Sequence, residues 1–135
     1  MDVPLPSPVA NADSLTYWNA AREHRLLLRK CNECGVLHFM PRFLCPNCWS
    51  DRLSWVESSG NGSIHSYTII RRAPAPAFAP IAPYVVALID LDEGPRMVAN
   101  IVGEDPLGVK IGDRVKVTFE DRGDGAKIPQ FTRVC

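Results

Sequence analysis

The chain contains CNECG at residues 31–35 and CPNC at residues 45–48, and these two stretches hold four of its five cysteines. In each stretch two residues separate the cysteines, so a tight loop can point both sulfur atoms at one place. Two such loops supply the four thiolates of a tetrahedral zinc site. We therefore predict a metal centre whose ligands are Cys31, Cys34, Cys45 and Cys48.

The four-cysteine pattern predicts a structural metal rather than a catalytic one. A catalytic zinc ion keeps one position open for water or substrate, whereas four cysteine ligands fill every position of a tetrahedral site. Structural Zn²⁺ is the expected cofactor, and iron in a rubredoxin-like site, which would use the same ligands, is the alternative. The fifth cysteine, Cys135, is expected to be an incidental terminal thiol, since the ligand set is complete without it.

The composition is that of a globular protein without net charge. The 135 residues include 15 basic and 15 acidic side chains, and 46% of them are hydrophobic. A protein that binds nucleic acid through its phosphates usually carries a basic face, so this balance makes a nucleic-acid partner unlikely.

The sequence shows no sign of membrane insertion or export. It contains no apolar run long enough for a transmembrane helix, and residues 1–8 lack the basic and apolar regions of a signal peptide. We therefore expect a cytoplasmic protein without membrane contact. In a reducing compartment, paired cysteines are better explained by metal binding than by disulfides.

The N-terminal third of the chain is expected to contain one helix and three strands. The helix is predicted at residues 14–24, where Leu15 and Trp18 begin an apolar stripe at helical spacing. Strands are predicted at residues 26–30, 36–39 and 53–57. Because these strands alternate with the two cysteine loops, their order is typical of a zinc ribbon.

The remainder of the chain is expected to form a small barrel. Residues 58–62 are rich in serine and glycine and are interpreted as a flexible junction. Five strand-like runs follow, at residues 63–71, 84–91, 96–102, 114–120 and 128–134. Five short strands with few helix signals favour a closed barrel, and an OB-fold is the leading candidate. The predicted fold is mostly β, with an N-terminal helix, a zinc ribbon and then a five-stranded OB-fold barrel.

These elements divide the chain into three predicted parts. They are an N-terminal arm and helix at residues 1–25, a rubredoxin-like zinc ribbon at 26–57 and an OB-fold domain at 58–135.

The segment between the first two barrel strands is a candidate contact surface. Residues 73–83 contain four prolines and no charge, which predicts a stiff, extended path. Phe78 within it and Tyr84 directly after it are candidate contacts for an apolar ligand or a partner. The alternative is a long loop that folds back on its own barrel.

Arg71 and Arg72 precede this segment and are candidate anion-binding residues. Arginine makes forked contacts with phosphate and diphosphate groups. The alternative is a solvated pair at the end of a strand.

No recognisable catalytic motif occurs in the sequence. The three histidines, His24, His38 and His65, have no carboxylate or nucleophile at a familiar spacing, and they are expected to be ordinary surface or strand residues. Nucleotide-binding glycine motifs and a nucleophile elbow are absent. The chain is therefore not expected to form an active site on its own, although an enzymatic role stays uncertain.

Several short motifs together make the chain resemble a known family. They are YWNAARE at 17–23, CNECG at 31–35, PR at 41–42, CPNC at 45–48, SGNG at 59–62, SYT at 66–68, APY at 82–84, EGPR at 93–96 and IGD at 111–113. Over residues 10–135 the chain resembles the DUF35 family of zinc-ribbon and OB-fold proteins that accompany thiolase-fold enzymes.

The resemblance implies an accessory role. Relatives in this family pair with thiolases, aldolases or acyltransferases that act on acyl-CoA or related acyl substrates, and the partner carries the catalytic residues. The expected partner is thus a thiolase-fold subunit, a coenzyme A thioester is a further possible contact, and the four cysteines carry over as metal ligands. A nucleic-acid-binding zinc-ribbon and OB module is the alternative function.

Overall fold

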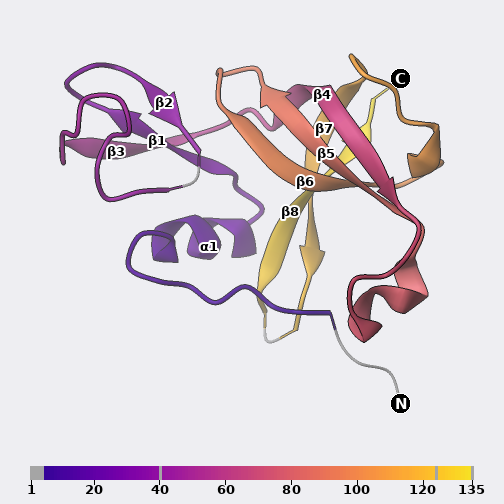
Figure 1. Cartoon of the computed structure of the whole chain (residues 1–135). Coiled ribbons are helices and arrows are strands. Elements are labelled where there is room, and N and C mark those ends of the chain that lie inside the picture. Colours follow the sequence, from indigo (N-terminus) through magenta and orange to yellow (C-terminus); the bar gives the residue numbers. More distant parts are fainter. Residues whose placement is uncertain (1–4, 40, 124, 135) are drawn as a thin grey trace.

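The computed structural model describes residues 5–39, 41–123 and 125–134, so Cys135 lies outside the described residues. Figure 1 shows two lobes, a small sheet that carries the cysteine loops and a larger barrel, with the helix α1 below the small sheet and beside the barrel. The predicted fold class is confirmed. No helix in the described part of the chain has the length and apolar character needed to cross a membrane.

The helix α1 spans Leu15–Arg22 and is shorter at each end than the prediction. Before it, Asn11 and Ser14 close a turn, in which the Ser14 amide donates to Asn11 Oδ1 at 2.9 Å and the Asn11 amide donates to Ser14 Oγ at 3.2 Å. The buried face consists of Tyr17, Ala20 and Ala21. The expected stripe was wrong about Leu15, which is 52% exposed, because the helix packs on the barrel through its small alanines rather than through its largest aliphatic side chain.

Three strands form the sheet of the smaller lobe, which we call the ribbon together with its two cysteine loops. The strands are β1 at Leu27–Cys31, β2 at Leu37–His38 and β3 at Leu53–Glu57, in the antiparallel order β2-β1-β3. The Arg29 guanidinium lies 4.1 Å from the centre of the Trp55 ring on the neighbouring strand. Strand β3 has no fully buried residue, so this sheet has little core of its own.

Five strands form the closed barrel. They are β4 at Asn61–Ile70, β5 at Tyr84–Leu91, β6 at Arg96–Val102, β7 at Arg114–Asp121 and β8 at Lys127–Arg133. The order around the barrel is β4-β5-β6-β8-β7, with β6 and β8 parallel and the other pairs antiparallel. The expected OB-like barrel is therefore present, since a closed five-stranded barrel of mixed order is characteristic of that fold.

Alternation along the strands builds the barrel core. Burial alternates without interruption along β5, where Val85, Ala87, Ile89 and Leu91 point inward. The same core cluster includes Tyr17 of α1 and two leucines at the start of the ribbon, Leu26 and Leu28. One apolar core thus holds the barrel, the helix and the first ribbon strand together.

The segment before β5 differs from its prediction. Instead of a fully extended path, Pro76–Ile81 forms a 3₁₀ helix, η1, and a second one, η2, spans Pro106–Gly108. Proline suits this conformation because its fixed φ is compatible with a helical turn and the first residues of a helix need no backbone donor. The segment is therefore a compact helical turn beside the barrel.

The expected flexible junction is instead tied to the barrel. Ser58 is 7% exposed and its hydroxyl donates to Glu93 Oε1 at 2.8 Å, while the Ser59 amide donates to Glu93 Oε2 at 2.8 Å. At Gly62 a Cβ atom would lie 2.7 Å from the Asp90 carbonyl oxygen. Only glycine allows the two backbones to approach this closely.

Candidate functional site

The four cysteine sulfur atoms converge at the tip of the ribbon. Cys31 is the last residue of β1. The two cysteine loops, called knuckles below, place all four Sγ atoms within 4.8 Å of one another. Cys31 Sγ lies 3.5 Å from Cys48 Sγ, and Cys34 Sγ lies 3.6 Å from Cys45 Sγ. With metal–sulfur bonds of about 2.3 Å, the sulfur atoms of a tetrahedral zinc site lie about 3.8 Å apart. The cluster therefore fits a metal ion bound by four cysteines.

The two knuckles have the same backbone. In the first, the Gly35 amide donates to the Cys31 carbonyl oxygen at 3.0 Å, and in the second the Trp49 amide donates to the Cys45 carbonyl oxygen at 2.9 Å. Both closing residues have a left-handed conformation, with φ of 78° at Gly35 and 68° at Trp49. Glycine meets this requirement without strain, whereas a bulky aromatic residue adopts it rarely.

Backbone and side-chain groups favour ionised sulfur at part of the cluster. The Cys34 amide points at Cys31 Sγ and the Asn47 amide at Cys45 Sγ, each at 3.4 Å. The backbone amide of Val36, followed by the side chain of Asn47, lowers the pKa of Cys34 to about 6. At Cys48 the backbone amide of Ser50 acts in the same direction, but crowding by the other sulfur atoms and burial raise the pKa to about 12. Four thiolates this close together would need a cation, and a metal ion held by the four cysteines would supply it.

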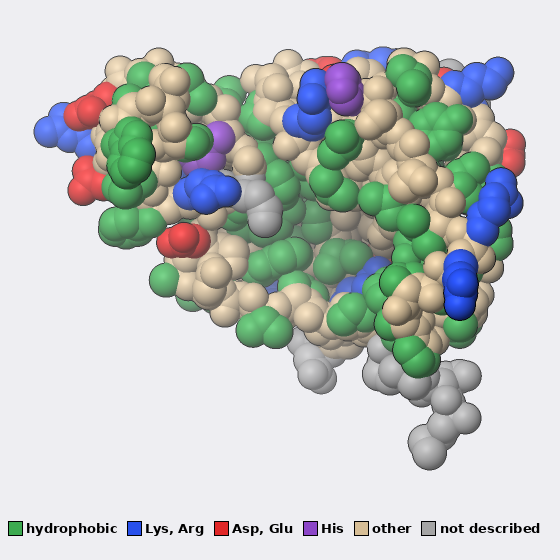
Figure 2. Space-filling model, viewed as in Figure 1, with side chains coloured by type: hydrophobic (Ala, Val, Ile, Leu, Met, Phe, Trp, Pro, Cys, Tyr) green, Lys and Arg blue, Asp and Glu red, His purple; other side chains and the backbone are tan. Residues whose placement is uncertain are grey.

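A second feature is an apolar cavity of about 890 Å³ between α1, the ribbon and the barrel. In the space-filling view it is the hollow between the two lobes, with hydrophobic side chains over its floor (Figure 2). Its lining comes from the helix and the turn before it, from the ribbon near Phe39 and Arg42, from η1 and from strands β5, β6 and β8. No single element encloses it.

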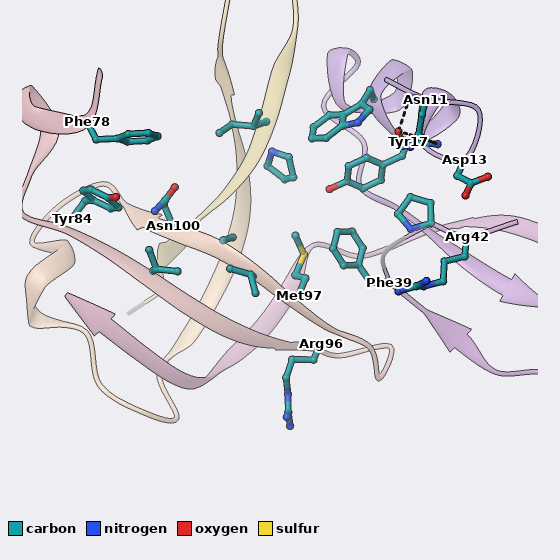
Figure 3. A pocket seen from close by; sticks show the side chains of 18 residues that line it. Asn11, Asp13, Tyr17, Phe39, Arg42, Phe78, Tyr84, Arg96, Met97 and Asn100 are labelled. Atoms are coloured by element: carbon teal, nitrogen blue, oxygen red, sulfur yellow. Dashed lines mark hydrogen bonds between the residues drawn. The ribbon is translucent and has the colours of Figure 1, made fainter. Parts of the chain in front are cut away.

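Aromatic side chains stand at both ends of this cavity. Phe78 and Tyr84 lie at one end, with ring centroids 5.8 Å apart, and Tyr17 and Phe39 lie at the other, 5.5 Å apart (Figure 3). Met97 lies between them on the floor (Figure 3). The cavity can therefore accept an elongated apolar group.

Few polar groups face this cavity. The Tyr17 hydroxyl points into it (Figure 3), and Tyr17 makes no hydrogen bond with any other described residue. Asn100 donates through Nδ2 to the Val85 carbonyl oxygen at 2.9 Å, which leaves its carbonyl oxygen uncommitted. Arg96 borders the cavity, but its side chain points away and pairs with Asp90 at 2.6 Å (Figure 3).

The candidate contact residues separate into two groups. Phe78 and Tyr84 both line the cavity. Arg71 and Arg72 are exposed beyond the end of β4, are not part of its lining and make no ion pair with another described residue. Sequence reasoning missed Tyr17, Phe39, Met97 and Asn100, because they come from elements whose mutual packing no local pattern reveals.

The three histidines have separate surroundings. His24 Nε2 lies 2.8 Å from Lys127 Nζ, and His65 Nδ1 lies 3.4 Å from Asp90 Oδ2. His38 is buried, and burial, reinforced by Arg29 and Arg42, lowers its pKa. Within residues 5–39, 41–123 and 125–134, no histidine is hydrogen-bonded to a serine, threonine or cysteine.

Each of the two lobes matches a known domain family. Residues 18–54 match the family model described as the ChsH2 rubredoxin-like zinc ribbon domain, and residues 55–120 match that of the ChsH2 C-terminal OB-fold domain.

Individual relatives agree with this assignment. A "DUF35 domain-containing scaffold protein" of Methanothermobacter thermautotrophicus is 40% identical over 105 residues, which are 77% of this chain and 78% of the relative. The "Benzoylsuccinyl-CoA thiolase subunit BbsA" of Geobacter metallireducens is 33% identical over 75 residues, covering 56% of this chain and 49% of that one. A "Probable enoyl-CoA hydratase alpha subunit" of Thermomonospora curvata is 36% identical over 126 residues, but these residues are 93% of this chain and only 39% of that longer relative.

A solved structure is similar over nearly its whole length. The "Ltp2-ChsH2(DUF35) aldolase" contains a chain that matches with a TM-score of 0.83 and 36% sequence identity, covering 93% of this chain and 98% of that one.

Proposed function

The chain belongs to the DUF35 family of zinc-ribbon and OB-fold proteins, and from this premise we propose that it is a non-catalytic subunit that supports a thiolase-fold enzyme acting on acyl-CoA or related acyl substrates. The observation that carries the proposal is the likeness to the DUF35 chain of an aldolase, with a TM-score of 0.83 over 98% of that chain. The name of a relative as a thiolase subunit supports the same assignment.

The four cysteines would bind structural zinc in this subunit. Their sulfur geometry supports the ligand set Cys31, Cys34, Cys45 and Cys48, and four thiolates leave no position for a substrate. The metal would stabilise the fold of the ribbon, and the chemistry would belong to the partner.

The described side chains support a non-catalytic role in another way. A nucleophile needs a neighbouring base to activate it, and none of the three histidines is hydrogen-bonded to a hydroxyl or thiol in the described part of the chain. The acid–base groups of the reaction would therefore come from the thiolase-fold subunit.

We retain the three-part division of the chain within this proposal. The arm and helix would occupy residues 1–25, the ribbon 26–57 and the OB-fold domain 58–135. The separate β2-β1-β3 sheet and closed barrel support it, and the tie between Ser58 and Glu93 lies at the proposed boundary. A cytoplasmic location stays a prediction.

Phe78 and Tyr84 are proposed as contacts for the acyl-CoA, and their place at one end of the cavity supports this. Arg71 and Arg72 stay proposed anion contacts. They are exposed and unpaired among the described residues, which leaves both guanidinium groups available to phosphates.

The test is assembly with a thiolase-fold protein of the same organism. We expect a complex on gel filtration at micromolar concentrations, with turnover of the thioester by the complex and none by the purified chain. Separate elution at these concentrations would contradict the proposal. The R71E/R72E variant should assemble normally but raise the KM for the thioester. R52E, which changes an exposed arginine of the ribbon, is the control, and an unchanged KM in R71E/R72E would remove the two arginines from the proposal.

The described cavity lining does not favour the nucleic-acid alternative. The cavity wall is mostly apolar, and the two arginines that border it, Arg42 and Arg96, are accompanied by the acidic Asp13. A single-strand binding groove needs a row of cations and stacking aromatic side chains.

A further inference from the structure

Three buried nitrogen atoms of the ribbon have no hydrogen-bond partner among the described residues. They are Nε of Arg29 and both ring nitrogens, Nδ1 and Nε2, of His38. In the described part of the chain the only other buried side-chain atom of this kind is Arg122 Nε. A buried polar group without a partner costs free energy. The gathering of three such atoms at two residues therefore indicates that this place accommodates an acceptor from outside the chain.

The two residues lie opposite each other on paired strands. Arg29 of β1 is the register partner of His38 on β2, and on its other side it is the partner of Trp55 on β3. Side chains at directly opposed positions project from the same face of a sheet. The three side chains therefore form one row across the ribbon, with Arg29 in the middle.

Trp55 orients the guanidinium group of Arg29. The central guanidinium carbon lies over the Trp55 ring, 4.1 Å from its centre. This contact uses the flat face of the guanidinium, so the N–H groups along its edge stay available for hydrogen bonds. Arg29 makes no ion pair with another described residue. Arginine binds a carboxylate through such an edge, with two parallel N–H···O bonds.

The charges around His38 favour a ligand that carries one negative charge. Burial lowers the pKa of His38, and the charges of Arg29 and Arg42 lower it further. Arg42 makes no ion pair with another described residue. Asp13 acts on Arg29 from the turn before α1 and contributes one negative charge. Two guanidinium groups and one carboxylate leave a net charge of about +1, which a single further carboxylate would neutralise.

The exposure of the three side chains defines the way in. Arg42 is exposed, Arg29 is half-buried and His38 is only 7% exposed. A ligand from solvent would thus meet the guanidinium groups first and His38 behind them, which suits a small group. Neither Arg29 nor His38 belongs to the lining of the apolar cavity.

We propose that Arg29, His38 and Arg42 form a binding site for the carboxylate group of a small molecule, which accepts hydrogen bonds from both guanidinium groups and from the imidazole. The site is separate from the four cysteines and does not depend on the proposed function. Its residues bind and perform no covalent step.

The experiment titrates the zinc-loaded full chain at constant ionic strength and follows the side-chain NMR signals of Arg29 and His38. The probes are acetate, acetamide, which has the same shape without the charge, and phosphate. Acetate should saturate both signals at about 1–10 mM, as a few charge-assisted hydrogen bonds allow. Acetamide should cause no saturable shift.

Two variants test the guanidinium groups. Arg42→Gln removes a charge at an exposed position and should weaken acetate at least about threefold. Arg29→Lys keeps the charge but loses the fork and should weaken acetate about three- to tenfold. Arg52→Gln is the matched control, because Arg52 is an exposed arginine of the same lobe that pairs with Glu33 at 3.5 Å. It should leave the affinity unchanged.

The pH dependence tests His38 separately. A bound carboxylate favours the protonated imidazole, so acetate should raise the pKa of His38. The affinity for acetate should therefore increase as the pH falls from about 8 to about 6, a range in which Arg29, Arg42 and Asp13 keep their charges. In His38→Gln the affinity should not vary over this range, whereas a purely structural histidine would leave the pH dependence as it is in wild type.

Four results would overturn the proposal: acetate shifts no larger than those of acetamide, tighter binding of phosphate than of acetate, an undiminished affinity in Arg42→Gln, or the same pH dependence in His38→Gln as in wild type. Tighter binding of phosphate would assign the cluster to phosphate groups instead. Because Arg42 is exposed, Arg42→Gln decides the question even if Arg29→Lys does not fold.

Discussion

The ribbon and the barrel reach order by different physical means. The barrel buries alternate residues along its strands and encloses side chains such as Phe131, which is 0% exposed. The ribbon leaves Phe43 67% and Trp49 77% exposed. The ribbon is expected to be ordered by its group of four sulfur atoms rather than by a hydrophobic core. So small a unit cannot bury enough apolar surface to fold alone.

The order of the ribbon is expected to depend on metal, and the stability of the barrel on packing. The ribbon contributes Leu26 and Leu28 at its start to the common core, and its partly buried Leu37, Phe39 and Trp55 pack against that core. Loss of the metal should therefore release the cysteine loops and leave the barrel folded, while a cavity in the barrel should lower the stability of the barrel without changing the metal ligands.

The largest effect is expected from removal of one cysteine. Cys48 is exposed, so Cys48→Ala removes a proposed metal ligand with little loss of packing. We expect the chain to lose its bound zinc and the ribbon to lose order, because metal-linked folding of such units contributes about 10 kcal/mol. Elemental analysis gives the zinc content, and amide hydrogen exchange compares the ribbon with the barrel.

Cys135→Ala is the control for this experiment and should keep one zinc ion per chain. A zinc-loaded Cys48→Ala protein with a protected ribbon would show that packing alone maintains this lobe, and the contrast between the two regions would then disappear.

A smaller effect is expected from a cavity in the barrel. Phe131→Ala should lower the free energy of unfolding by about 3–5 kcal/mol, since it removes a fully buried aromatic ring. The zinc content should stay unchanged. Urea denaturation measures the loss, and Phe43→Ala, at an exposed position of the ribbon, should change stability by no more than about 0.5 kcal/mol. Similar losses for the two phenylalanines would mean that the ribbon is as dependent on packing as the barrel.

The smallest effect is expected at the tie between the two regions. Burial opposes ionisation of Glu93, but the Ser59 amide and the Ser58 hydroxyl stabilise its carboxylate and bring the pKa below its ordinary 4.5. Glu93→Gln should cost about 1 kcal/mol at pH 7, because the amide replaces a charged acceptor of two hydrogen bonds.

The contribution of Glu93 to stability should decrease as the pH falls. The pKa of Glu93 is lower in the folded than in the unfolded chain, so its contribution is complete above about pH 4.5 and is lost as the pH falls through the folded value. The stability difference between wild type and Glu93→Gln should therefore narrow between pH 5 and pH 3 in urea titrations. The exposed Glu104→Gln is the control. A difference that does not depend on pH would show that the carboxylate does not hold the junction.

Much of the fold could be predicted because its signals are local. The strands Leu53–Glu57, Tyr84–Leu91 and Arg96–Val102 have the predicted bounds, since alternation of side chains and the turns between strands are written in neighbouring residues. The expected apolar stripe of α1 was wrong about Leu15, and the expected extended path was wrong about Pro76–Ile81. Packing decided which face of α1 is buried, whereas the prolines of Pro76–Ile81 favour the helical turn locally.

By itself the sequence determined that four cysteines meet and that a β-barrel follows them. The spacing within each cysteine pair and the strand-like residues around the pairs are enough for that conclusion. Each cysteine loop is held by hydrogen bonds within its own backbone, so its shape depends on neighbouring residues. Only the tertiary structure decided that Tyr17, Phe39, Met97 and Phe78 surround one cavity. They come from a helix, the ribbon, a barrel strand and a loop, and a space between such elements exists only after each has packed against the others.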